Sequence, residues 1–149
     1  MADLNDFIID RDAVRDGEWI TVGDGGNTFE IRTRGFTPKY RDALNALRRH
    51  AARDLNRKLQ PGDAMYSADT LPPSADDRCQ GQATATHCVM DVRGLTSKGV
   101  AVTVEQFRDL LSDPEGRTGL LILAIGAASR VGTDRKEETA VAEGNSLPA

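Results

Sequence analysis

Residues 38–59 constrain the fold more than any other segment, because they have the pattern of a long amphipathic helix. Thr37 suits the N-cap, Pro38 suits the first helical position, and Pro61-Gly62 ends the segment. Along one face, apolar side chains recur at the helical period of about 3.6 residues: Tyr40, Ala43, Leu44, Leu47, Ala51, Leu55 and Leu59. The pattern predicts a helix that packs this face against a core.

The opposite face of this helix is basic. From Lys39 to Lys58 there are seven basic and two acidic residues, a net charge of +5, which leaves −9 for the rest of a chain with a formal net charge of −4. Arg49, Arg53 and Arg57 recur at four-residue spacing and could form a solvated surface, bind a partner's carboxylates, or contact nucleic acid phosphates. The acidic remainder and the lack of aromatic residues between the arginines disfavour nucleic acid.

A β-hairpin is predicted directly before the helix. Residues 18–22 and 28–34 are rich in β-branched and aromatic side chains. The glycine-rich residues 23–27 between them suit the positive φ angles of a tight turn. In the second strand, charged residues alternate with a set that is predicted to face the core: Phe29, Ile31 and Thr33.

The second half of the chain is predicted to be mainly helical. Residues 63–75 have the composition of a loop, residues 76–90 favour a helix, and residues 91–102 favour a short turn with extended flanks. Thr103 and Gln106 have the spacing of a capping box, which predicts the start of a short helix.

The last helix is expected to begin with Asp113 as its N-cap and Pro114 at its first position, and to run to about Val131. It is apolar on most sides from residue 120 onward. It is therefore either a central core helix or a surface for a partner or a second copy of the chain. Its candidate docking residues are Leu120, Leu121 and Ile125.

Together these segments predict an α+β fold in which the hairpin packs with about four helices. A chain of 149 residues suits one domain, expected over residues 17–132. Residues 1–16 are expected to form an N-terminal arm without a strong element, in which residues 7–9 are apolar and could dock on the domain. Residues 133–149 are polar and unpatterned, which predicts a disordered, flexible tail.

The residue types that carry catalysis or bind metals are few and dispersed. Cys79, His87 and Cys88 come closest to a metal-binding set, but helical positions eight and nine apart differ by about 80° and 180°, so three ligands would not converge. The only other histidine is His50, and no serine lies in a nucleophile elbow. Residues 23–27 lack the lysine of a phosphate-binding loop. The sequence therefore predicts no enzyme, no metal and no other cofactor.

No membrane partner is expected, because no run approaches the roughly 20 apolar residues of a membrane span. The first residues also lack the basic and apolar regions of a secretory signal. These features predict a cytoplasmic protein.

Several short segments follow one another in a fixed order and spacing between residues 17 and 146. They are Gly17-Glu18-Trp19-Ile20-Thr21-Val22, Phe29-Glu30-Ile31-Arg32-Thr33-Arg34-Gly35, Cys88-Val89-Met90-Asp91-Val92-Arg93-Gly94-Leu95, Val104-Glu105-Gln106-Phe107, Leu110-Leu111-Ser112-Asp113-Pro114 and Glu143-Gly144-Asn145-Ser146. In this order and spacing the chain resembles the tail-assembly chaperones of tailed bacteriophages, although Val92 stands where members of that family often have a tryptophan.

This resemblance implies a protein that is not an enzyme and that acts in the cytoplasm of the host cell. The implied partner is the long tape-measure protein, which such chaperones bind before the tail tube polymerises around it. The tail tube protein and a second copy of the chain are further candidate partners. Two alternatives stay open: a structural virion protein, such as a minor tail or head–tail joining subunit, and a nucleic-acid-binding regulator that uses the basic helix.

Overall fold

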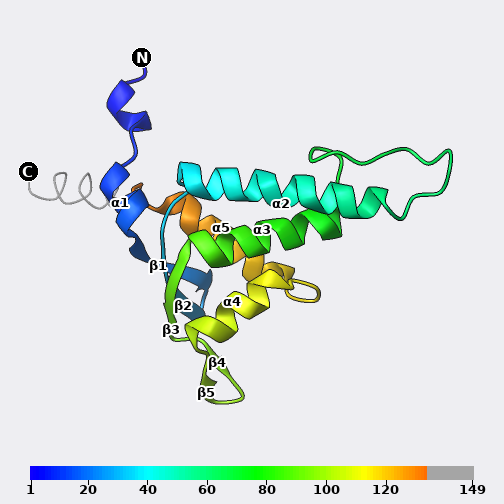
Figure 1. Cartoon of the computed structure of the whole chain (residues 1–149). Helices are drawn as coiled ribbons and strands as arrows, with labels where there is room; N and C mark the ends of the chain where they lie inside the picture. The colour runs from blue at the N-terminus through cyan, green and yellow to red at the C-terminus, as the bar shows by residue number, and fades with distance from the viewer. Residues whose placement is uncertain (134–149) are drawn as a thin grey trace, which may run out of the picture.

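In the computed structural model, which describes residues 1–133, five α-helices pack with a small three-stranded antiparallel sheet and a short two-stranded ribbon (Figure 1). The predicted α+β class is confirmed. From residue 134 onward, the predicted flexible tail lies outside the described residues.

The predicted hairpin forms the first two strands of the sheet, β1 (Glu18–Asp24) and β2 (Asn27–Thr33). The strands are antiparallel, with Ile20 opposite Ile31 and Val22 opposite Phe29. These four side chains are buried, as the alternation predicted. The hairpin therefore supplies one apolar face for helices to cover.

A third strand, β3 (Val89–Arg93), pairs antiparallel with β2. The helix predicted over residues 76–90 is therefore wrong at its end, because it stops at His87 and the chain continues as this strand. The pairing has a register shift, with Thr33 opposite Val89 but Arg32 opposite Asp91. On the outer face Arg93 forms an ion pair with Glu30, and its guanidinium lies 3.9 Å from the centre of the Trp19 ring.

The other face of the sheet is covered by α4 (Val104–Ser112) and α5 (Thr118–Arg130). The ring of Phe107 in α4 meets Phe29 edge-on, with the ring centres 6.1 Å apart. The predicted capping box at Thr103 and Gln106 begins α4. The main core, which includes Ile31, Phe107 and Leu111 without exposed area, therefore lies between the sheet and these two helices.

The predicted start of the last helix is wrong. Asp113 ends α4 instead of capping α5, and a turn over residues 115–116 separates the two helices. The N-cap of α5 is Arg117, which makes no side-chain capping bond. The pair Asp113-Pro114 is typical of turns as well as of helix starts, and in this structure it leads into the turn.

Two helices form an outer layer over this core: α2 (Pro38–Asn56), the predicted basic helix, and α3 (Pro73–His87). Thr37 caps α2 as predicted, although the helix ends three residues before Leu59. Under α2 a second, smaller core joins Tyr40 to Ala83, Cys88 and Ala128. α3 therefore lies between α2 on one side and α4 and α5 on the other.

The N-terminal arm has more structure than the sequence predicted. It contains a short 3₁₀ helix, η1 (Leu4–Phe7), and a six-residue helix, α1 (Arg11–Asp16), which the side chain of Asp10 caps. Ala13 of α1 joins the main core. η1, by contrast, has no buried residue and projects from the body beside α1 (Figure 1).

A small ribbon also projects from the body, beyond the end of β3 (Figure 1). It consists of β4 (Thr96–Ser97) and β5 (Val100–Ala101), which pair antiparallel around Lys98 and Gly99. Both turn residues have positive φ angles, 51° and 80°. This is the geometry of a two-residue type I′ turn.

Candidate functional site

The outer helices α2 and α3 run side by side in opposite directions. Tyr40 near the start of α2 packs against Ala83 near the end of α3, while Arg48 farther along α2 reaches Asp76 near the start of α3. The second contact is a bidentate ion pair, in which Arg48 Nε donates to Asp76 Oδ1 at 2.6 Å and Arg48 Nη2 donates to Asp76 Oδ2 at 3.4 Å. These contacts hold the pair of helices at both ends of their overlap.

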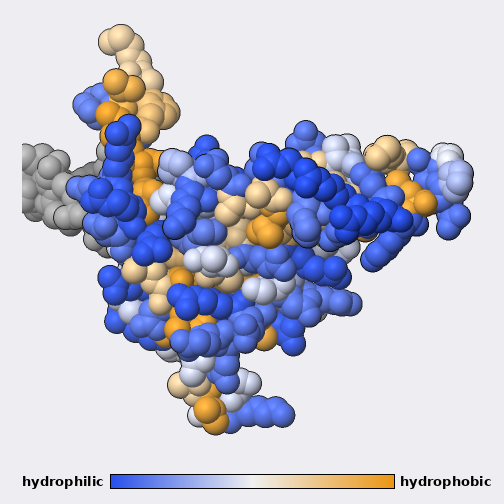
Figure 2. Space-filling view, viewed as in Figure 1, coloured by the Kyte–Doolittle hydropathy of each residue, from blue (hydrophilic) through white to orange (hydrophobic). Residues whose placement is uncertain are grey.

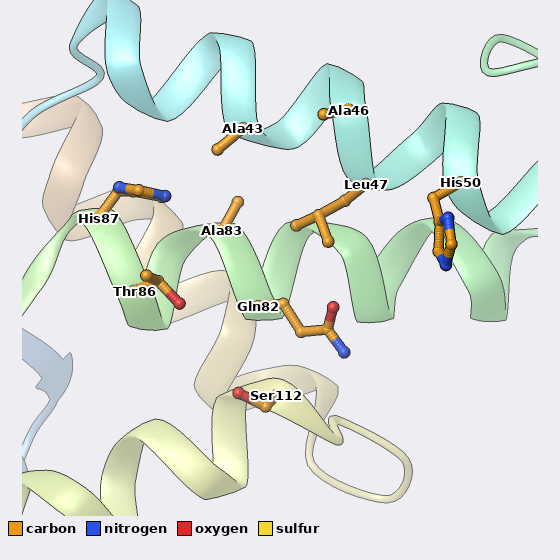
Figure 3. Close-up of a pocket in the computed structure, with 9 residues that line it drawn as sticks. All are labelled: Ala43, Ala46, Leu47, His50, Gln82, Ala83, Thr86, His87 and Ser112. Atoms are coloured by element: carbon orange, nitrogen blue, oxygen red, sulfur yellow. The ribbon is translucent and has the colours of Figure 1, made fainter.

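Alongside these contacts the helices leave an open groove of about 620 Å³ on the surface (Figure 3). We call it the α2–α3 groove. Figure 2 shows apolar colour within mainly hydrophilic surroundings where the two helices run together. The residues that line it come from α2, α3 and the end of α4: Ala43, Ala46, Leu47, His50, Gln82, Ala83, Thr86, His87 and Ser112.

The groove is open because its facing positions are small. Ala43 from α2 points toward Ala83 from α3, so methyl groups stand where larger side chains would meet and close the gap, and Ala46 also lines the groove (Figure 3). Leu47 is the one large aliphatic residue among those that line it. A volume of this size lies within the roughly 300–1,000 Å³ typical of binding pockets, so several side chains of a ligand or partner could enter.

Polar side chains are spread along the groove instead of converging at one point, with Thr86, Gln82 and Ser112 between the two histidines (Figure 3). His87 lies at one end and His50 at the other (Figure 3). His50 Nε2 is 3.5 Å from Asp54 Oδ2, and the Ser112 hydroxyl donates to the backbone carbonyl of Arg108. Within residues 1–133 there is no cluster of three or more His, Cys, Asp and Glu side chains suited to a metal ion. The arrangement fits binding by shape and burial.

The predicted arginine stripe borders the groove on α2. Arg49 and Arg53 are exposed and make no ion pair within residues 1–133, whereas Arg57 lies 3.3 Å from Asp54. Arg53 follows the groove residue His50 by three positions, and Arg49 follows Ala46 by three, so both lie beside the groove on the helix surface. On α3, the exposed Arg78 stands one turn before Gln82. The rim of the groove therefore carries Arg49, Arg53 and Arg78, none of which has a carboxylate partner in the part of the chain that the structure describes.

The structure does not bring the predicted α5 residues to this stripe. Leu121 is 3% exposed and belongs to the main core, while Leu120 and Ile125 are half-buried and pack against it. Ile122, which the sequence did not single out, is 69% exposed. α5 lies on the far side of α3 from α2, so the two sets of candidate docking residues are separate surfaces.

Both cysteines are buried free thiols that face the interior. Burial raises the pKa of Cys88 to about 12, and burial followed by the nearby Asp76 raises the pKa of Cys79. The Cys88 thiol lies 3.8 Å from the carbonyl oxygen of Gly35. A thiol whose pKa is raised is a poor nucleophile at neutral pH, so these residues pack as small apolar groups.

Several of the large exposed apolar side chains of the described region are gathered on the arm. Leu4 is 74% exposed and Phe7 is 71% exposed, and Ile8 is also exposed. Figure 2 shows this segment as an apolar projection from the body. Of the three apolar residues expected to dock on the domain, only Ile9 contacts it, beside Gly132.

Within residues 1–133, no helix combines the length and the apolar character needed to cross a membrane. Comparisons of the chain with protein-family models, with curated proteins and with solved structures give no match.

Proposed function

We propose that this protein is a non-enzymatic chaperone of phage tail assembly that holds a helical segment of the tape-measure protein in the α2–α3 groove. The proposal combines the resemblance carried by residues 17–146 with one structural observation, the groove itself. An elongated surface with small apolar residues and a charged rim suits an amphipathic helix, which would place its apolar face against the alanines.

The charges on the rim indicate what kind of helix would bind. Arg49, Arg53 and Arg78 are exposed, and within residues 1–133 none of them is paired with a carboxylate. A client helix with acidic residues beside its apolar stripe would pair with these arginines at the edge of the groove. Exposed pairs contribute modestly, so the client would remain displaceable when the tail tube protein polymerises in the host cytoplasm.

Co-expression of the chain with the tape-measure protein of the same phage tests the proposal. The wild-type chain is expected to raise the soluble fraction of the tape-measure protein and to co-purify with it. Ala46→Trp fills the groove from an exposed position and is expected to weaken capture by about tenfold or more, as expected for a blocked apolar site.

Asn45→Trp is the matched control, because Asn45 is the preceding residue on α2, is also exposed and does not line the groove. It should capture the client as well as the wild type does. If the two proteins neither co-purify nor change each other's solubility, the chaperone proposal is wrong. Equal loss of client capture in both tryptophan variants would indicate that the client binds to another surface.

A further inference from the structure

We propose that the arm of one copy, residues 1–8, binds in the α2–α3 groove of a second copy, so that the protein associates with itself through arm and groove. This inference concerns the same groove as the proposed function, but it is tested without any client, so either can fail while the other stands.

The arm has the composition of a segment that binds elsewhere. Leu4, Phe7 and Ile8 are exposed and η1 buries none of its residues, so these side chains leave much of their apolar surface uncovered. Exposed apolar side chains gathered on one short segment are typical of an interaction site. The only charged side chains among residues 1–8 are Asp3 and Asp6, which makes the arm both apolar and acidic.

The groove can accept both the apolar and the acidic side chains of the arm. Its floor is apolar and its free volume is about 620 Å³, enough for two or three large side chains. Arg49, Arg53 and Arg78 border it, and none of them has a carboxylate partner within residues 1–133. Asp42 on α2 and Asp109 and Asp113, which flank Ser112 on α4, are exposed carboxylates near the groove, whereas Asp54 lies close to Arg57 and His50. The positive charge is therefore local to the three arginines beside α2 and α3, where the carboxylates of Asp3 and Asp6 can approach.

The arm is also long enough to span the groove. From Ala43 to His50 the groove follows seven residues of helix, about 10 Å at a rise of 1.5 Å per residue. Eight residues of arm span up to about 26 Å when extended, at about 3.3 Å per residue. One arm can therefore cover the whole groove, with Leu4, Phe7 and Ile8 as the apolar anchors.

The base of the arm indicates that the groove belongs to a second copy. Ile9 and the backbone of Asp10 occupy the space where a side chain at position 132 would stand, and Asp10 caps α1. These contacts fix the direction in which the arm leaves the body, and residues 1–8 then project away from α2 and α3 (Figure 1). Binding to its own groove would need the arm to reverse at this anchored point, whereas binding to another copy needs no rearrangement.

Complementation between two variants of the full chain tests the inference. Phe7→Ser with Ile8→Ser removes the arm's anchors, and Ala46→Trp fills the groove. Analytical ultracentrifugation of each variant alone should show association weakened by at least about tenfold relative to the wild type. A mixture of the two should recover association, because the arm variant keeps an intact groove and the groove variant keeps an intact arm.

Val100→Ser is the matched control for the arm, since Val100 is exposed to the same degree in the β4–β5 ribbon. It should associate as the wild type does. Hydrogen exchange at residues 4–8 should slow as the protein concentration rises. A wild-type chain that stays monomeric, a mixture that does not recover, or protection of the arm that is independent of concentration would each overturn the inference.

Discussion

Gly81 of α3 lies directly on the backbone carbonyl of Leu111 in α4, so close that a β-carbon at position 81 would overlap the carbonyl oxygen. The neighbour is backbone, which cannot rotate away as the end of a side chain can. This contact sets the distance between α3 and α4, and through α4 it sets the distance between the outer helices and the sheet.

Gly81→Ala is therefore expected to destabilise the fold by more than about 3 kcal/mol, at the upper end of the range for overpacked cores. Chemical denaturation monitored by circular dichroism measures the change. Gly126→Ala is the matched control, because Gly126 is helical but a β-carbon there meets open space. That change should stabilise the protein by about 0.5–1 kcal/mol. Equal effects at the two positions would contradict the close approach of α3 to α4.

The ion pair between Arg48 and Asp76 should contribute measurably to the packing of α2 on α3. Both side chains are less than one-third exposed, and Asp76 also accepts a hydrogen bond from Gln80. A double-mutant cycle with Arg48→Met and Asp76→Ala is expected to give a coupling energy of about 1–2 kcal/mol. The same cycle on Arg15 and Asp12, which are almost fully exposed, should give no measurable coupling.

Stability should fall at alkaline pH because of Cys88. Burial raises its pKa from 9.0 to about 12, so between these values the unfolded chain loses the thiol proton while the folded chain keeps it. The unfolded state then binds fewer protons, and the free energy of unfolding decreases as the pH rises, by up to about 1.4 kcal/mol per pH unit.

Denaturation curves between pH 8.5 and 10 measure this slope. Cys79 and Tyr40, whose pKa values burial also raises, add to the slope in the same direction, so the comparison with Cys88→Ala isolates the contribution of Cys88. The variant should show a shallower slope than the wild type. Identical slopes would mean that the thiol reaches solvent in the native state.

Replacement of Arg49 and Arg53 by alanine should weaken binding of an acidic partner without unfolding the protein. Both side chains are exposed and carry no ion pair within residues 1–133, so their loss costs the fold little. Binding by the wild type should decrease as salt is added, and the double variant should show a weaker dependence on salt. Titration at two salt concentrations measures both effects, with Arg15→Ala as an exposed control. If binding responds equally to salt in the wild type, the double variant and Arg15→Ala, then Arg49 and Arg53 do not bind the acidic partner.

Elements with strong local signals could be predicted from the sequence. The hairpin follows from alternation around a glycine-rich turn, α2 from its apolar period and Thr37 cap, and α4 from its capping box. β3 was missed because its five residues have a register shift opposite Arg32 and Thr33, which interrupts the alternation that marks a strand. The start of α5 was misplaced because Asp113-Pro114 suits a turn as well as a helix cap.

The groove could not be predicted, because an alanine on an amphipathic helix has the same pattern whether it is buried or lines a depression. Ala43 belongs to the predicted apolar face of α2, but only the partner helix decides how deeply it is covered. The opposing residues, such as Ala83, lie about 40 positions away in the chain, and no periodicity links them. The exposure of Arg49 and Arg53 could be predicted, because charges at four-residue spacing opposite an apolar face are a local signal, whereas their role in binding stays a prediction.

The β4–β5 ribbon offers a position for a label that stays away from both proposed binding surfaces. Every residue from 96 to 101 is exposed, and Lys98 and Gly99 form a turn that contacts neither the cores nor the groove. Loop tips of this kind accept inserted sequence with little loss of stability. An epitope or a fluorescent label placed between Lys98 and Gly99 would therefore report where the protein is located while leaving both proposed binding surfaces intact.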